Sequence, residues 1–151
     1  MILLFPFANK LQNNKPNPKS PPIPWWEELI SLIDDDIIQV GIDGEHQLVP
    51  NFKKNCSVEE LSTMIKDCTT WIGIDSYGQH LCWSLNKYGI VIWGQSNPII
   101  FGHPENINLL KHPSYLMKNQ FLKWDMVPYI SECFVSPQEV VKYISIFKTG
   151  E

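Results

Sequence analysis

The sequence predicts an α/β protein, a three-layer Rossmann-like domain with a mostly parallel sheet. Short, wholly apolar runs of the kind found in buried parallel strands recur along the chain. Stretches with helical spacing and helix-start signals separate these runs, and such alternation is typical of a parallel sheet covered by helices. The 151 residues have the length of one domain, and we expect a single domain over residues 1–151.

Composition narrows the classes of function. The chain is 44% hydrophobic and 19% charged, which is typical of a folded protein. Its net charge of −4 disfavours a general nucleic-acid binder, so we expect no nucleic-acid partner. We expect no membrane span and a cytoplasmic location, because no apolar run is long enough and the amino terminus lacks a basic lead. Four cysteines without a CxxC pair are interpreted as reduced thiols of the core.

The first strand is predicted at Ile2–Phe5, and a long loop follows it. Residues 9–24 are rich in asparagine, lysine and proline, and five of the nine residues from Pro16 to Pro24 are proline. Proline excludes a helix here and favours extended, polyproline-like backbone. Because loops of this length in compact domains are often functional, we mark it as a candidate site segment. No G-x-G-x-x-G follows the first strand, which disfavours an ordinary nicotinamide dehydrogenase.

A helix is predicted at Trp25–Ile33, with Pro24 near its first position and Glu27 and Glu28 in its opening turn. A strand follows at Ile37–Ile42. The three aspartates between them are interpreted as a solvated link, because a hard cation needs ligands that converge from several directions. We therefore expect no metal site.

The next helix has a clear start signal. Ser57 and Glu60 have the spacing of a capping box, which predicts a helix over Val58–Lys66. The residues before it, 45–50, are predicted as a loop or a short strand that follows an Asp-Gly turn.

The central unit is a strand, a sharp turn, a helix and a second strand. The strands are predicted at Trp71–Ile74 and Ile90–Trp93, and Ser76 and Gln79 have capping-box spacing between them. The helix is expected to close on a basic last turn and Gly89.

A helix that starts beyond the carboxyl end of a parallel strand presents free N–H groups and attracts phosphate. Ser76, Gly78 and His80 stand at that point in the sequence. This part of the chain is therefore the first candidate binding site.

The carboxyl-terminal third is less regular. A last short strand is predicted at Ile107–Leu110. The polar residues 103–106 before it are interpreted as a turn, or else as a loop on the candidate site's side of the sheet. Residues 111–135 are predicted to be irregular. The serine, proline and glutamate at positions 136, 137 and 139 form a start signal for a final helix over 136–148. The aromatic residues expected to anchor the irregular segment are Tyr115, Phe121, Trp124, Tyr129 and Phe134.

Residues 72–98, IGIDSYGQHLCWSLNKYGIVIWGQSNP, resemble a family motif. The motif belongs to the carboxyl-terminal, donor-binding domain of family-nine, heptosyltransferase-like glycosyltransferases of the GT-B architecture. Its pattern is a strand, D-S/T-G-x-x-H-L-A-x-A-L-G, and a strand ending in F-G-x-T-x-P. The positions that match are Asp75, Ser76, His80, Leu81, Leu85, Gly94 and Pro98. Tyr77 replaces the usual glycine, and Ser96 stands for the threonine.

The resemblance implies one half of a GT-B glycosyltransferase, which binds a nucleotide-diphosphate sugar donor without a metal or another cofactor. The family's phosphate-contacting lysine could correspond to Lys10, Lys15 or Lys19, and Glu45 to a glutamate that contacts the nucleotide's sugar. Tyr77 could narrow the pocket or stack on a base. The donor-binding residues implied are Asp75, Ser76, Tyr77, Gly78, His80, Lys10, Glu45 and Ser96.

Catalysis is not explained by this chain alone. In the family, the first domain supplies the catalytic base and binds the acceptor, and no residues here correspond to it. The first hypothesis is therefore glycosyl transfer completed by a partner chain or a homodimer. The alternatives are a non-catalytic nucleotide-binding module and a structural or interaction protein. Exposed apolar patches around Trp25, Trp26 and Trp124 would favour an interaction protein.

Overall fold

The computed structural model describes residues 1–148 and has the predicted α/β architecture. Six strands form one sheet in the order β3-β2-β1-β4-β5-β6, and every pairing is parallel. The strands are β1 (Ile2–Phe5), β2 (Ile37–Gly41), β3 (Phe52–Lys54), β4 (Thr70–Ile74), β5 (Ile90–Trp93) and β6 (Ile107–Leu110). The α-helices are α1 (Ile23–Leu32), α2 (Val58–Asp67), α3 (Tyr77–Ser84), α4 (Pro98–Phe101) and α5 (Pro137–Lys148).

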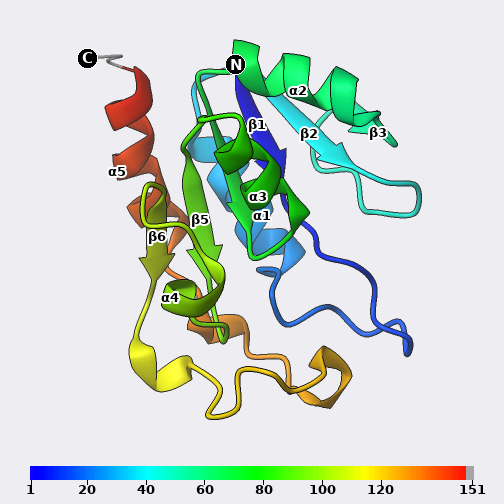
Figure 1. Cartoon of the computed structure of the whole chain (residues 1–151), viewed down its shortest axis with the longest axis vertical. Coiled ribbons are helices and arrows are strands. Elements are labelled where there is room, and N and C mark those ends of the chain that lie inside the picture. The colour runs from blue at the N-terminus through cyan, green and yellow to red at the C-terminus, as the bar shows by residue number, and fades with distance from the viewer. Residues whose placement is uncertain (149–151) are drawn as a thin grey trace.

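Helices cover both faces of the sheet, which gives three layers (Figure 1). Alternate residues of β1 pack on opposite faces of the sheet. Ile2 and Leu4 pack with residues of α1 and α5, whereas Leu3 and Phe5 pack with residues of α2 and α3. Because both faces of β1 and β4 are buried, β1 and residues 71–74 of β4 are continuous apolar runs, as predicted.

The strand order places a topological switch point between β1 and β4. The chain proceeds from β1 to β2 and β3 on one side, and from β4 to β5 and β6 on the other. In open α/β sheets, ligands bind outside the carboxyl ends of the strands at such a point. The loop after β1 and the start of α3 therefore meet where a binding site is expected.

Two helix starts agree with the sequence. The Ser57 hydroxyl accepts a hydrogen bond from the Glu60 N–H at 3.1 Å, and the Ser136 hydroxyl accepts one from the Glu139 N–H at 3.2 Å. The prediction for α1 was wrong by two residues, because the helix begins at Ile23 and no acidic residue lies in its first turn. Pro24 fits the first turn, where N–H groups have no partner within the helix.

The predicted capping box at Ser76 and Gln79 is wrong. Ser76 is the residue before α3, but its side chain makes no capping hydrogen bond. The Gln79 amide instead donates to Asp75 Oδ1 and to the Phe101 carbonyl, both at 3.3 Å. The helix also ends earlier than predicted, at Ser84, and Asn86, with φ of 57°, takes the left-handed position assigned to Gly89.

Two short elements were missed. Strand β3 is a three-residue edge strand whose Phe-Lys-Lys sequence has no apolar run to reveal it. Helix α4 is a single turn capped by Asn97, whose side chain accepts from the Ile99 N–H at 2.9 Å. Within residues 1–148, no helix has the length and apolar character needed to cross a membrane.

Candidate functional site

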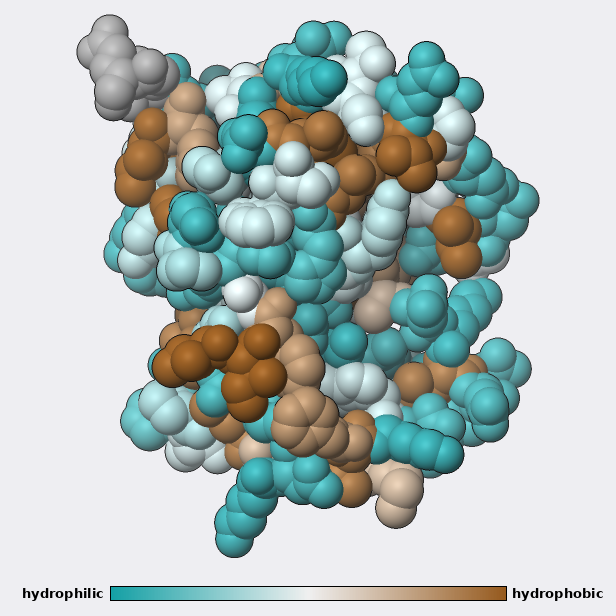
Figure 2. Space-filling model, in the orientation of Figure 1, coloured by the Kyte–Doolittle hydropathy of each residue, from teal (hydrophilic) through white to brown (hydrophobic). Residues whose placement is uncertain are grey.

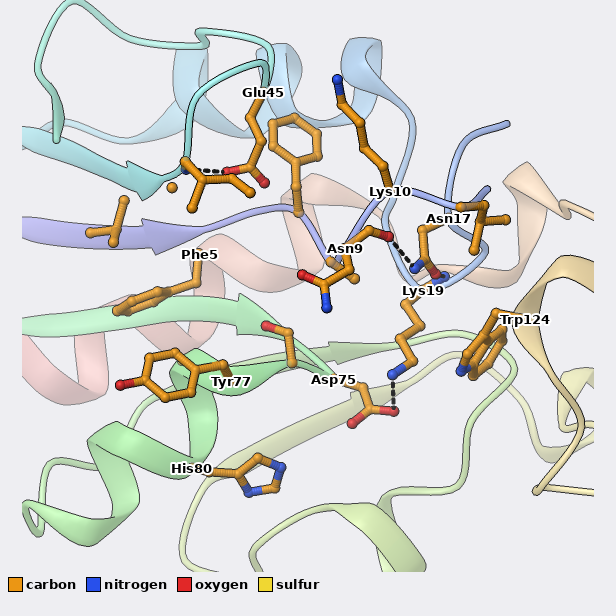
Figure 3. Close-up of a pocket in the computed structure, with 18 of the residues that line it drawn as sticks. Phe5, Asn9, Lys10, Asn17, Lys19, Glu45, Asp75, Tyr77, His80 and Trp124 are labelled. Atoms are coloured by element: carbon orange, nitrogen blue, oxygen red, sulfur yellow. Dashed lines mark hydrogen bonds and ion pairs between the residues drawn. The ribbon is translucent and has the colours of Figure 1, made fainter. Parts of the chain in front are cut away.

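A cavity of about 1070 Å³ opens at the switch point (Figure 3). Its walls come from the loop after β1, the turn after β2, the start of α3 and residues 120–125. Seven of the eight residues predicted for the donor site line it: Asp75, Ser76, Tyr77, Gly78, His80, Lys10 and Glu45. The eighth, Ser96, is buried behind β5 and is not in the lining.

Lys19 is the lysine that reaches the start of α3. Its Nζ lies 3.5 Å from Asp75 Oδ2 and 5.2 Å from the centre of the Trp124 ring (Figure 3). Asp75 is only 7% exposed, and its other oxygen accepts from Gln79. A buried carboxylate needs such partners, so this cluster fixes the middle of the long loop at the cavity floor.

Lys10 and Glu45 lie together on another wall of the cavity (Figure 3). Glu45 Oε1 accepts a hydrogen bond from the Ile42 N–H at 2.7 Å. Burial raises the pKa of the Glu45 carboxyl, and the hydrogen bond and the positive charge of Lys10 oppose that effect. Gly44 has φ of 89°, and a Cβ there would lie 3.1 Å from Lys10 Nζ.

The start of α3 packs closely against the end of β1. A Cβ on Gly78 would lie 2.6 Å from the Phe5 ring, so glycine lets the first turn of the helix pack against the end of β1. Within the described residues, the Ser76 hydroxyl has no hydrogen-bond partner, and Ser76 lines the cavity. Free N–H groups of the first turn add a partial positive charge at the same place. Tyr77 is exposed at the rim.

His80 lines the cavity one turn into α3. Its Nδ1 lies 2.8 Å from Nε2 of His103, in the 103–106 segment, for which a plain turn was favoured over a loop at the site. The pKa of His80 is lowered, first by burial and then by His103, while Asp75 opposes the change. The sequence signal for His103 was the polar character of residues 103–106, which in the structure lie between α4 and β6.

The irregular segment supplies a wall that the sequence did not reveal. Gln120 anchors it: its Oε1 accepts from the Asn97 N–H at 2.9 Å, and its Nε2 donates to the carbonyls of Gln95 and Met117. Lining residues from this segment are Gln120, Phe121, Lys123, Trp124 and Asp125. They form no periodic pattern, so only the folded chain brings them to the site.

Apolar side chains are exposed beside this wall. Ile99, Phe121 and Met126 are 91%, 78% and 71% exposed. Figure 2 shows strongly hydrophobic side chains gathered at the lower left, where α4 lies in Figure 1. Trp25 and Trp26 are buried in the core and provide no such patch. Phe121 is therefore not the anchor that was predicted, whereas Phe134 is buried in the core.

The cysteines are free thiols, as predicted, and three of them are buried in the core. Cys68, Cys82 and Cys133 are buried free thiols, and Cys56 is half-buried. Among residues 1–148, no group of three or more histidine, cysteine, aspartate or glutamate side chains is arranged to hold a metal ion.

Comparison with known proteins finds similarity in structure rather than in sequence. No protein-family model and no curated protein sequence matches the chain. The structure of E. coli heptosyltransferase WaaC with ADP matches at a TM-score of 0.64 and 16% identity, over 97% of this chain and 44% of that one. E. coli ADP-heptose LPS heptosyltransferase II matches at 0.68 and 16%, over 99% and 46%.

A third similar structure is the dodecameric, iron-containing heptosyltransferase TibC in complex with ADP-D-β-D-heptose. Its TM-score is 0.66 at 11% identity, over 99% of this chain and 45% of that one. The chain thus spans less than half the length of each of these structures. At such identities the likeness concerns the fold, which matches a Rossmann-like half of a GT-B heptosyltransferase.

Proposed function

We propose that the cavity binds the diphosphate of a nucleotide-sugar donor, and that the chain is the donor half of a glycosyltransferase-like protein. The observation that carries this proposal is the convergence of Lys19, the Ser76 hydroxyl and the start of α3 at the switch point of this fold. A diphosphate is recognised by a lysine charge together with free helical N–H groups. Two of the similar structures are complexes with ADP or with ADP-D-β-D-heptose, which supports the same ligand class here.

The remaining lining residues fit the other parts of such a ligand. Glu45 offers an oxygen to the hydroxyls of the nucleoside sugar, and Tyr77 offers an exposed ring to a base. A diphosphate that departs during transfer needs positive groups, and the proposal assigns this role to Lys19 and His80 rather than to a metal. The cavity, of about 1070 Å³, is slightly larger than most small-molecule sites, which span about 300–1,000 Å³.

A ligand screen tests the donor site. The purified chain is scanned by thermal shift and calorimetry against ADP, UDP, GDP, CDP and their sugar conjugates, with and without EDTA. At a hundred times Kd, a ligand that binds only the folded state adds about 2.7 kcal/mol of stability. We expect one nucleotide series to raise Tm equally with and without EDTA. No shift with any of them would refute the donor site.

Transfer needs an acceptor site and a base that removes the acceptor proton. We propose that a partner supplies both, either a second copy of this chain or a separate chain. The support is that the similar heptosyltransferases are more than twice as long as the matched chain. Sedimentation analysis of the purified protein with the bound nucleotide sugar distinguishes the two: a dimer mass indicates self-assembly, and a monomer mass indicates a separate partner.

A second candidate function is a non-catalytic interaction protein on this fold. The specific observation that favours it is the exposed apolar set around Ile99, Phe121 and Met126. Binding of a nucleotide sugar in the screen favours the donor site. A null screen combined with self-association that Ile99→Asp abolishes favours the interaction protein.

Glu45→Gln is expected to raise thermal stability at neutral pH. Burial raises the pKa of Glu45, so the folded protein binds more protons there than the unfolded chain, and stability falls as pH rises past the ordinary carboxyl range. Glutamine removes the buried charge and still accepts from the Ile42 N–H. The Tm advantage should be present at pH 7 and vanish below pH of about 4, where free glutamate is protonated. Glu27→Gln, on the exposed face of α1, is the control, and an equal gain there would contradict the assignment.

A further inference from the structure

Two histidines from separate elements are in direct contact at the edge of the cavity. His80 Nδ1 and His103 Nε2 are 2.8 Å apart, and the ring planes are nearly perpendicular, at 81°. His80 lines the cavity and points its ring to the region below Asp75 (Figure 3), whereas His103 lies outside the lining. His103 therefore stands behind His80 as seen from a ligand.

His103 is itself held in place. Its ring stacks on Trp83 with centroids 4.4 Å apart and an interplanar angle of 11°. The Trp83 indole N–H donates to Glu105 Oε2 at 3.2 Å. The His103 carbonyl accepts from the Asn108 side chain at 2.9 Å and from the Asn106 N–H at 3.1 Å. Both the ring and the backbone of His103 are thus fixed before any ligand binds.

The contact restricts where the imidazole protons lie. A hydrogen bond between two ring nitrogens needs an N–H on one and a lone pair on the other. If His103 Nε2–H donates, neutral His80 carries its own proton on Nε2 and can donate to an anion. In the opposite arrangement, neutral His80 presents a lone pair on Nε2, which repels a phosphate oxygen. Within residues 1–148, His80 Nε2 has no hydrogen-bond partner, so it is available for a ligand.

We propose that His103 is a positioning residue, which holds His80 in the orientation and tautomer that direct its Nε2–H at an anionic group in the cavity. This inference rests on the proposed diphosphate-binding function. The same pair accepts one proton from solvent when the anion binds: His80 then donates through Nδ1 to His103 Nε2, and the proton of neutral His103 lies on Nδ1. A second added proton would place two imidazolium rings in contact, which their repulsion disfavours.

The charges around the pair support coupling between binding and protonation. In the free protein, the pKa of His80 is lowered by burial, by His103 and by Lys19, and it is raised by Asp75. The other nearby carboxylate, Glu105, is hydrogen-bonded to the Trp83 indole. An anion in the cavity favours the charged form of His80, so binding takes up a proton and tightens as pH falls from 8 to 6. Diphosphate diesters suit this measurement, because their charge is constant over that range.

The first test reads the tautomer of His80 directly. The chain has four histidines, so their ring nitrogens can be resolved by ¹⁵N NMR of the labelled protein without ligand. We expect His80 in the wild type as the Nε2–H tautomer, and a mixture of tautomers in His103→Phe, whose ring can still stack on Trp83. His112→Phe removes another exposed histidine, whose ring is hydrogen-bonded to Ser114 rather than to the cavity residues, and serves as the control. An unchanged His80 tautomer in His103→Phe would overturn the proposal.

The second test measures affinity, with ADP-ribose and UDP-glucose as probes. At pH 7, His103→Phe should bind about 3- to 10-fold more weakly, the worth of one neutral hydrogen bond. Calorimetry in buffers of different ionisation enthalpy should show proton uptake in the wild type and less in the variant. His103→Gln keeps a donor and an acceptor and should recover most of the affinity.

The outcomes separate the inference from the function on which it rests. Binding with the same affinity and proton uptake in wild type and His103→Phe overturns the positioning role and leaves the donor site standing. No binding of either probe by the wild type, together with a null screen, overturns the donor site. The NMR result then decides by itself whether His103 holds His80.

Discussion

Lys19→Met is expected to weaken binding of the nucleoside diphosphate by about 10- to 100-fold, because a hydrogen bond to a charged group is worth about 1.5–3 kcal/mol. Lys19 Nζ lies 3.5 Å from Asp75 Oδ2 at the start of α3, where the phosphates are proposed to bind. Methionine keeps a long apolar side chain against Trp124 and removes only the charge. Isothermal calorimetry at two salt concentrations measures the loss and its electrostatic origin.

The other lysines of the loop provide the matched controls. Lys15 is not in the lining of the first cavity but lines a second one, of about 680 Å³, at the proline-rich loop, so Lys15→Met should leave the affinity unchanged. Lys10 lines both cavities beside Glu45, and Lys10→Met should have an intermediate effect. A loss in Lys15→Met that exceeds the loss in Lys19→Met would contradict the assignment.

Lys19→Met also removes a partner of a buried carboxylate, so its effect on stability must be separated from its effect on binding. Asp75 would keep only the Gln79 amide. The variant should therefore lose about 1 kcal/mol of stability, and Lys19→Met with Asp75→Asn should regain part of it. If the double variant regains stability but not affinity, Lys19 acts on the ligand directly.

Gly89→Ala is expected to lower the free energy of unfolding by about 3 kcal/mol, at the upper end of the usual cost of overpacking a core. A Cβ at Gly89 would lie 2.5 Å from the Trp71 indole and 2.6 Å from the Trp71 carbonyl oxygen. Neither can yield, because Trp71 is fully buried in β4 and its indole N–H donates to the Lys87 carbonyl at 2.9 Å. For a chain of this length, Tm should fall by about 6–12 °C.

Gly41→Ala is the matched control for this prediction. The atom nearest to a Cβ at Gly41 is Glu45 Oε1, the end of a flexible side chain that can move aside, and the Phe52 ring follows at 3.0 Å. The control should cost clearly less in urea denaturation than Gly89→Ala. Equal costs would show that the tight fit against Trp71 does not decide the need for glycine at position 89.

Sequence and structure can be compared at single residues. Ser57 and Ser136 were recognised as helix caps, because a cap depends on residues three positions apart. Ser76 has the same local pattern and does not cap, because Gln79 bonds instead to Asp75 and to the Phe101 carbonyl. A contact across 22 positions thus overrode a local signal.

By itself, the sequence determined the α/β class, the five apolar strands and the helix start that carries Asp75, Ser76 and His80. These features depend on short-range periodicity and spacing, which are visible along the chain. Only the tertiary structure decided that Lys19 rather than Lys15 reaches Asp75, that His103 contacts His80, and that residues 120–125 close the cavity. Those contacts involve irregular loops, which are held in place by distant hydrogen bonds such as those of Gln120 and Tyr129. A loop without periodicity has no sequence pattern that predicts where it packs.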